Sequence, residues 1–347
     1  MPSVSFDPRL RLQVGKDNNN NPNQHGVAIE EIPGLIKVYK DGHVERPPLV
    51  PNVTCVVSPE LDITCKDVSI DKLTNVWARF YVPKCEESDT MKLPLLVYFH
   101  GGGFCVGSAS WKGYHDFLGK LACKSWCVIM SVNYRLAPEN RLPAAYGDGH
   151  NALVWVRQQT LDASSDQKWW WGRCNFSRVY VAGDSAGANI AYNVASRVGS
   201  LGAINPVVLK GLILIQPFFG GETRTNSERT MVQPPNSVLS LTSSDSYWRL
   251  SLPIGSNRDH PWCNPLAKGE TKLEELRLPP SMVCIPEMDI LKDRNLDFCK
   301  AMSRAKKSVE HVVQMGVGHA FQVLHNSQLS KARTDEMMSH IKGFIHR

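Results

Sequence analysis

One stretch of the sequence, residues 178–192, constrains the fold and chemistry of this chain more than any other. It opens with an apolar run at 179–182, which is typical of a short buried strand. A tight turn follows at 183–187, with a serine placed between two glycines. After the turn, apolar residues recur at the spacing of one buried helix face: Ala191, Val194, Ala195 and Val198. A strand, a glycine-flanked serine and a helix form the context of a nucleophile elbow.

The spacing within this turn has a physical reason. A serine on so tight a turn has strained backbone angles, and its neighbours must be small enough to let the chain fold back. Gly183 and Gly187 supply that space, and the start of the next helix directs free N–H groups toward Ser185. The motif alone leaves an alternative open, because a serine at this place is also a common helix N-cap. Partner residues elsewhere in the chain have to decide between the two interpretations.

Composition excludes several classes of protein. With 347 residues, of which 42% are hydrophobic and 21% charged, the chain has the composition of a soluble globular protein. Its net charge of +6 is scattered, so we expect no nucleic-acid partner. No apolar run is long enough for a membrane span, and residues 1–11 lack the pattern of a signal peptide, so we expect a cytoplasmic protein without a membrane partner. The ten cysteines are expected to be reduced, and we predict no metal site.

Apolar runs and helical patterns alternate along most of the chain. This alternation favours an α/β fold with a mostly parallel central sheet covered by helices. Residues 1–27 are polar and rich in asparagine, and we expect them to form a disordered or variable tail before a single domain at 28–347. The predicted strands are 68–70, 76–82, 95–99, 127–132, 179–182, 207–215, 281–285 and 309–315. Helices are predicted near 113–124, 144–159 and 294–305, and one more follows the glycine-flanked serine.

The regular alternation breaks between residues 218 and 265, which are polar and rich in proline. A long irregular insertion in a compact domain is usually a lid or a binding region. Six apolar or aromatic residues in this insertion and after the strand 95–99 are candidates for the walls of an apolar pocket. They are Phe104, Val106, Phe218, Phe219, Tyr247 and Trp248, and residues of these types are more often plain core than pocket wall.

The partners that a nucleophilic serine needs follow the later strands. In open α/β sheets, functional groups converge at the loops after the carboxyl ends of the strands. Asp289 follows the strand 281–285 and is the candidate orienting carboxylate, while His319 follows the last strand and is the candidate base. Alone, they would be an ordinary N-cap and an ordinary loop histidine, but their order after the serine matches one known order of a hydrolase triad. The loop after 281–285 offers two alternative carboxylates, Glu287 and Asp293.

A glycine triplet at 101–103 directly follows the strand and His100. Residues without side chains let backbone N–H groups approach a carbonyl oxygen, and this loop is where a second oxyanion donor is found next to a nucleophile elbow. We therefore predict an oxyanion hole formed by the N–H groups of Gly102, Gly103 and Ala186, each contributing about 3–4 kcal/mol to transition-state stabilisation. The coincidence of elbow, carboxylate, histidine and glycine triplet favours catalysis over an N-cap.

Together these motifs resemble the hormone-sensitive-lipase group of α/β-hydrolases, and within it the plant carboxylesterases related to the gibberellin receptor. The resemblance extends from about residue 30 to the end of the chain. It implies an α/β-hydrolase fold without a metal or organic cofactor, and a cap built from the N-terminal segment and about 218–255. The motifs that carry the resemblance are 38–47, His100-Gly-Gly-Gly103, 133–139, Gly183-Asp-Ser-Ala-Gly187, 217–221, 259–265, Asp289 and Gly318-His319.

The resemblance implies a serine carboxylesterase that hydrolyses small esters through a Ser-His-Asp triad and an acyl-enzyme. An apolar pocket suits esters of aromatic or terpenoid alcohols, and we expect a monomer or weak dimer. Two other functions occur on this scaffold. Some relatives in plant specialised metabolism catalyse elimination or cyclisation with an intact triad, so a lyase is the alternative. A hormone receptor is disfavoured, because the gibberellin receptor resembles an esterase whose catalytic histidine is replaced, whereas His319 is present here.

Overall fold

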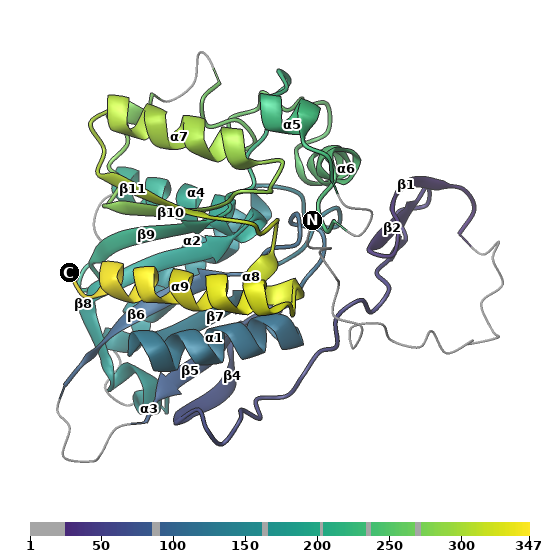
Figure 1. Ribbon diagram of the computed structural model, residues 1–347. Coiled ribbons are helices and arrows are strands. Elements are labelled where there is room, and N and C mark those ends of the chain that lie inside the picture. The colour runs from purple at the N-terminus through teal and green to yellow at the C-terminus, as the bar shows by residue number, and fades with distance from the viewer. Residues whose placement is uncertain (1–24, 85–90, 162–165, 202–203, 234–236, 268–271) are drawn as a thin grey trace.

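The computed structural model describes residues 25–84, 91–161, 166–201, 204–233, 237–267 and 272–347. Most of the predicted variable tail, 1–27, therefore lies outside the described residues. Within them, one large twisted sheet carries helices on both faces (Figure 1). This arrangement confirms the predicted α/β class.

The central sheet has the strand order β11-β10-β9-β8-β6-β7-β5-β4. All neighbouring pairs from β11 to β7 are parallel, whereas β5 pairs antiparallel with both β7 and β4. The first parallel strand, β6, lies between β7 and β8, so the connections diverge at β6, and the carboxyl end of such a strand is where ligands usually bind in open α/β sheets. The strands are β4 (Ile63–Asp71), β5 (Val76–Pro83), β6 (Leu93–Phe99), β7 (Val128–Asn133), β8 (Cys174–Asp184), β9 (Leu209–Ile215), β10 (Ser281–Pro286) and β11 (Val309–Gln314).

The central sheet lies between two apolar cores, and helices cover the core on each face. Helices α1 and α9 cover one face, and α2 and α4 cover the other (Figure 1). The sequence of strand β6 is apolar without interruption because the strand lies between both cores. Leu95 and Val97 face one core, and Leu96 and Tyr98 face the other. The helices are α1 (Lys112–Ser125), α2 (Ala144–Leu161), α3 (Lys168–Trp171), α4 (Ala186–Leu201), α5 (Asn226–Thr230), α6 (Leu241–Ser251), α7 (Lys292–Arg304), α8 (Phe321–Leu324) and α9 (Gln328–Ile345), with a short 3-10 helix at Leu273–Glu275. No helix in the described ranges is long and apolar enough to cross a membrane.

The two segments expected to form a cap lie together. The N-terminal segment forms a small antiparallel sheet of β1 (Ala28–Ile32), β2 (Ile36–Tyr39) and β3 (Val44–Glu45). Strand β1 contacts helix α6 of the insertion (Figure 1). The Arg249 guanidinium lies 2.9 Å from the Glu30 carboxylate. The insertion also contains α5, which the periodicity did not predict. Its signal was the capping box of Thr225 and Glu228, which satisfies free N–H groups at the start of this short helix.

Candidate active site

Ser185 occupies the sharp turn between β8 and α4. Its φ of +52° lies in the left-handed region, which is strained for any residue other than glycine. A Cβ atom on Gly183 would overlap the backbone of Gly187, and a Cβ on Gly187 would overlap the carbonyl oxygen of Phe99. The two glycines are therefore required by the close approach of β6 and α4, and the turn has the predicted elbow geometry.

Three residues far apart in sequence meet at the carboxyl ends of β8, β10 and β11. His319 Nε2 lies 2.9 Å from Ser185 Oγ, and His319 Nδ1 lies 2.6 Å from Asp289 Oδ2. The exposed fractions are 5% for Ser185, 1% for Asp289 and 7% for His319, so the row of hydrogen bonds is largely shielded from water. Asp289 Oδ1 also accepts a hydrogen bond from the N–H of Leu291, which fixes the carboxylate from its other side.

The two alternative carboxylates have other partners. Glu287 accepts a hydrogen bond of 2.8 Å from the N–H of Gly316, and Asp293 accepts one of 2.7 Å from the N–H of Ser227. Each of these bonds fixes a loop or a helix start. Asp289 is therefore the carboxylate of this loop that is hydrogen-bonded to His319.

The backbone N–H groups of the glycine loop and of the elbow differ in whether the protein itself uses them. Within the described part of the chain, the N–H groups of Gly102, Gly103 and Ala186 donate no hydrogen bond to a protein acceptor. The N–H of Ser185 differs, because it donates to the carbonyl of Ile215 at 2.9 Å. The three predicted oxyanion donors are thus free to bind an oxygen of a ligand.

Asp184 joins the elbow to this glycine loop. Its carboxylate accepts hydrogen bonds from the Tyr98 hydroxyl at 2.8 Å, the Tyr114 hydroxyl at 3.0 Å and the N–H of Gly101 at 3.0 Å. Burial raises the pKa of Asp184 from an ordinary 3.8 to about 6, although these three donors oppose the shift. Asp184 therefore links the end of β8 to β6 and to the glycine loop.

The raised pKa of Asp184 predicts a pH dependence of stability. Between about pH 4 and pH 6 the folded protein holds a proton that the unfolded chain releases, so this carboxyl destabilises the fold increasingly as pH rises. A shift of this size corresponds to about 3 kcal/mol. We expect denaturant unfolding to show that, as pH rises from 4 to 7, the wild type loses about 3 kcal/mol of unfolding free energy relative to Asp184→Asn. A difference that does not change with pH would contradict the prediction.

All six candidate pocket residues are buried, with exposed fractions of at most 5%. Two of them flank the glycine loop: the Tyr247 ring packs on Gly103, and the backbone and side chain of Val106 pack on Gly102. Phe218 and Trp248 stack with ring centroids 4.6 Å apart, and Phe104 lies 5.5 Å from the same indole. Phe219 packs on Phe298 at 4.9 Å instead. Tyr247 and Val106 are thus the candidates nearest the oxyanion donors, and the role of the six as pocket walls stays a prediction.

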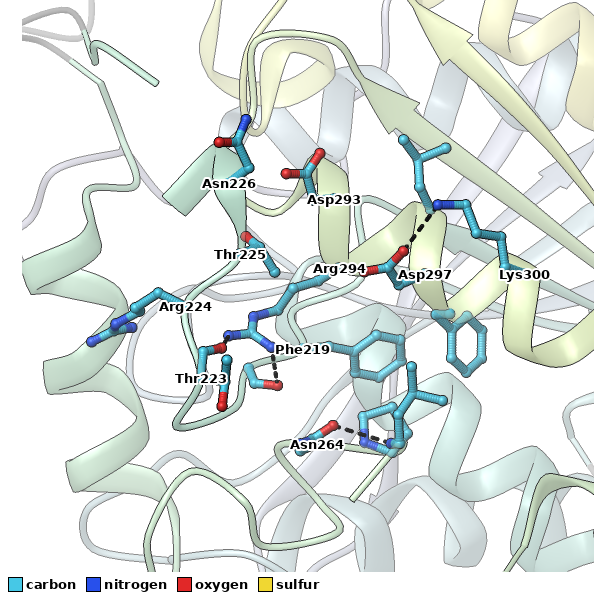
Figure 2. A pocket seen from close by; sticks show the side chains of 15 residues that line it. Phe219, Thr223, Arg224, Thr225, Asn226, Asn264, Asp293, Arg294, Asp297 and Lys300 are labelled. Atoms are coloured by element: carbon cyan, nitrogen blue, oxygen red, sulfur yellow. Dashed lines mark hydrogen bonds and ion pairs between the residues drawn. The ribbon is translucent and has the colours of Figure 1, made fainter. Parts of the chain in front are cut away.

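A cavity of about 550 Å³ lies between α5, α7 and the loops at the start and the end of the insertion (Figure 2). Its described lining contains Phe219 but none of Ser185, Asp289 and His319. Figure 2 shows the Arg294 side chain extending from α7 toward the loop that carries Thr223. The charged side chains that line the cavity form ion pairs or cap a helix. These side chains therefore stabilise the insertion.

Arg294 ties the insertion to the segment that carries Asp289. Its guanidinium lies 2.8 Å from the Glu228 carboxylate and donates to the carbonyls of Gly220 and Thr223, each at 2.8 Å. The side chains of Arg294 and Glu228 are only 10% and 3% exposed. Sequence reasoning missed this contact, because the two residues are 66 positions apart.

Replacing Arg294 by methionine is expected to destabilise the protein by about 3–5 kcal/mol, because Glu228 is then left as an unpaired buried carboxylate. The measurement is the free energy of unfolding in denaturant. Lys300→Met is the matched control on the same helix, since Lys300 forms an exposed pair with Asp297 that contributes about 0.5 kcal/mol or less. Equal losses of unfolding free energy in the two variants would show that the buried Arg294–Glu228 ion pair does not stabilise the protein more than an exposed pair.

The described residues contain no group of three or more histidine, cysteine, aspartate and glutamate side chains able to hold a metal ion. The cysteines in these residues are free, and most of them are buried.

Comparison with known proteins gives concordant matches. A family model described as alpha/beta hydrolase fold matches residues 96–323. The chain is 51% identical over 334 residues to probable carboxylesterase 6 of Arabidopsis thaliana, covering 96% of each protein. It is 35% identical over 304 residues to 2-hydroxyisoflavanone dehydratase of Glycyrrhiza echinata, covering 85% of this chain and 90% of that protein. An esterase from Pyrobaculum calidifontis superposes with a TM-score of 0.66 at 27% identity, covering 82% of this chain and 84% of that structure.

Proposed function

This chain belongs to the plant carboxylesterases of the α/β-hydrolase family and is a carboxylic ester hydrolase, and we propose that Ser185, His319 and Asp289 form its catalytic triad. The observation that carries the assignment is the unbroken row of hydrogen bonds from Ser185 Oγ through the His319 ring to Asp289 Oδ2, at 2.9 and 2.6 Å. This row has the geometry that nucleophile, base and orienting carboxylate require.

The reaction follows from the positions of these groups. Ser185 Oγ attacks the ester carbonyl while His319 Nε2 takes its proton, and Asp289 accepts the Nδ1–H bond that holds the ring in the required tautomer. The negative oxygen of the tetrahedral intermediate binds the N–H groups of the oxyanion hole, Gly102, Gly103 and Ala186. His319 then protonates the leaving alcohol. A water molecule, activated by the same histidine, releases the acid from the acyl-enzyme.

For the substrate, we propose a small ester of an aromatic or terpenoid alcohol. The support for this class is the apolar surface that Tyr247 and Val106 form directly beside Gly103 and Gly102. A cytoplasmic location and a monomeric or weakly dimeric state, both expected from the sequence, belong to the same proposal.

Elimination is the second candidate reaction, and the 35% identity to a dehydratase is the observation that favours it. An elimination uses a base and an oxyanion hole but needs no covalent acyl group on serine. The two reactions therefore differ in whether Ser185 becomes acylated.

The test is hydrolysis of p-nitrophenyl acetate and butyrate by the purified protein, combined with mass spectrometry of enzyme quenched during turnover. Hydrolysis with an added acetyl or butyryl mass on the peptide that carries Ser185 is the expected result. A folded protein that neither hydrolyses these esters nor becomes acylated would reject the esterase assignment and favour elimination.

A further inference from the structure

The oxyanion loop, residues 102–106, contains three successive residues with positive φ values. Gly102, Gly103 and Phe104 follow one another with φ values of +110°, +57° and +65°. A left-handed conformation at a bulky residue such as Phe104 is unfavourable unless the surroundings impose it. Contacts from outside the loop must therefore maintain the positions of its N–H groups.

Each carbonyl of this loop from 102 to 105 accepts a hydrogen bond. Gly102 O accepts from the N–H groups of Cys105 and Val106 within the loop, both at 3.0 Å. The other three carbonyls use donors from elsewhere in the chain. Phe104 O accepts from the N–H of Ala137 at 2.9 Å, Gly103 O accepts from Ser251 Oγ at 3.1 Å, and Cys105 O accepts from Arg46 Nε at 2.6 Å.

Two of these outside donors belong to the cap. Ser251 is the last residue of α6 in the insertion and is fully buried, and its own carbonyl accepts the N–H of Leu142 at 2.9 Å. Arg46 follows β3 of the N-terminal sheet. Its guanidinium also binds the Glu139 carboxylate, at 2.6 and 2.7 Å, and the Ala137 carbonyl at 2.9 Å. The insertion and the N-terminal segment thus reach the same short loop from two sides.

Fixing these carbonyls fixes the direction of the neighbouring N–H groups. The C=O and N–H of one peptide unit lie in one plane and point in opposite directions, so a rotated peptide turns both. The Gly103 N–H shares its peptide with the Gly102 carbonyl, which accepts from the N–H of Val106, and the Val106 N–H in turn shares its peptide with the Cys105 carbonyl that Arg46 binds. Ser251 holds the peptide on the other side of Gly103, a residue about which rotation meets little steric resistance. If Arg46 or Ser251 were lost, the peptides on either side of Gly103 could turn, and the Gly103 N–H would leave the position that a developing oxyanion requires.

We propose that Ser251 and Arg46 are positioning residues that hold the oxyanion loop in its active form, so that docking of the cap and catalytic competence are coupled. This inference rests on the proposed function, because it assigns a role toward the oxyanion hole of that reaction. Through these two residues, the cap contributes to stabilisation of the transition state.

The test compares Ser251→Ala and Arg46→Met with two matched controls, using p-nitrophenyl butyrate. Ser246→Ala removes another buried hydroxyl of α6, one that is hydrogen-bonded to Arg249. Glu139→Gln removes the charge partner of Arg46 but keeps the guanidinium that binds Cys105 O. We expect kcat to fall roughly 10- to 100-fold in Ser251→Ala and Arg46→Met with KM within about two-fold of the wild type, and about two-fold changes or less in the controls.

A second readout separates positioning from general damage to the fold. A trifluoromethyl ketone adds to the nucleophile and places an oxyanion in the hole, so its affinity should fall in proportion to kcat, while inhibition by the product alcohol stays unchanged. Thermal unfolding shows that each variant is folded at the assay temperature. Unchanged kcat and ketone affinity in folded Ser251→Ala and Arg46→Met would overturn the inference while leaving the esterase assignment intact. An inactive wild type would instead refute the proposed function.

Discussion

Replacement of Ser185 by alanine is expected to lower kcat for p-nitrophenyl acetate by roughly 10⁵- to 10⁶-fold, because the attacking oxygen is removed. The fold should remain, since the backbone bonds at this turn do not involve the side chain. The N–H of Ser185 donates to Ile215 O at 2.9 Å, and its carbonyl accepts from the N–H of Phe218 at 3.0 Å. Steady-state kinetics together with circular dichroism and thermal unfolding measure both parts of this expectation.

A buried serine outside the site provides the control for this variant. Ser131 lies on β7 and is fully buried, so Ser131→Ala tests whether loss of any buried hydroxyl reduces activity. Its kcat should stay within about two-fold of the wild type. If Ser185→Ala kept more than about a tenth of the wild-type rate, Ser185 would not be the nucleophile.

Asp289→Asn should lower kcat by roughly 10⁴-fold, the second largest effect expected here. The amide oxygen can still accept the N–H of Leu291, so the loop keeps its shape. The amide nitrogen, however, is a donor facing His319 Nδ1, and it favours the tautomer that carries its proton on Nε2. That tautomer cannot accept the proton of Ser185.

Glu287→Gln is the matched comparison for this carboxylate. Glu287 lies in the same loop, and its side chain accepts only a backbone N–H, from Gly316, among the described contacts. A glutamine oxygen can accept the same bond, so kcat is expected to change by about two-fold or less. Measuring kcat of both variants across pH 5–9 distinguishes the two carboxylates. A larger loss in Glu287→Gln than in Asp289→Asn would show that Glu287, and not Asp289, is the orienting carboxylate.

The core of the fold could be predicted because its signals are local. Strand β6 is uninterrupted apolar sequence because it faces both cores, and the turn at Ser185 requires small residues on both sides because β6 and α4 approach it closely. Helix α5 was missed because five residues are too few for a periodic apolar face, although its capping box was readable.

The sequence by itself therefore determined the chemistry available: a serine on an elbow, a glycine loop after β6, and a histidine and carboxylates after the last two strands. Only the tertiary structure decided between Asp289 and its two neighbours, because the choice depends on which oxygen lies 2.6 Å from His319. The supporting contacts were likewise out of reach. Arg46 and Ser251 meet the oxyanion loop across 59 and 148 positions of sequence. Periodicity and motif spacing describe interactions within one element, whereas such contacts arise only when separate elements pack against each other.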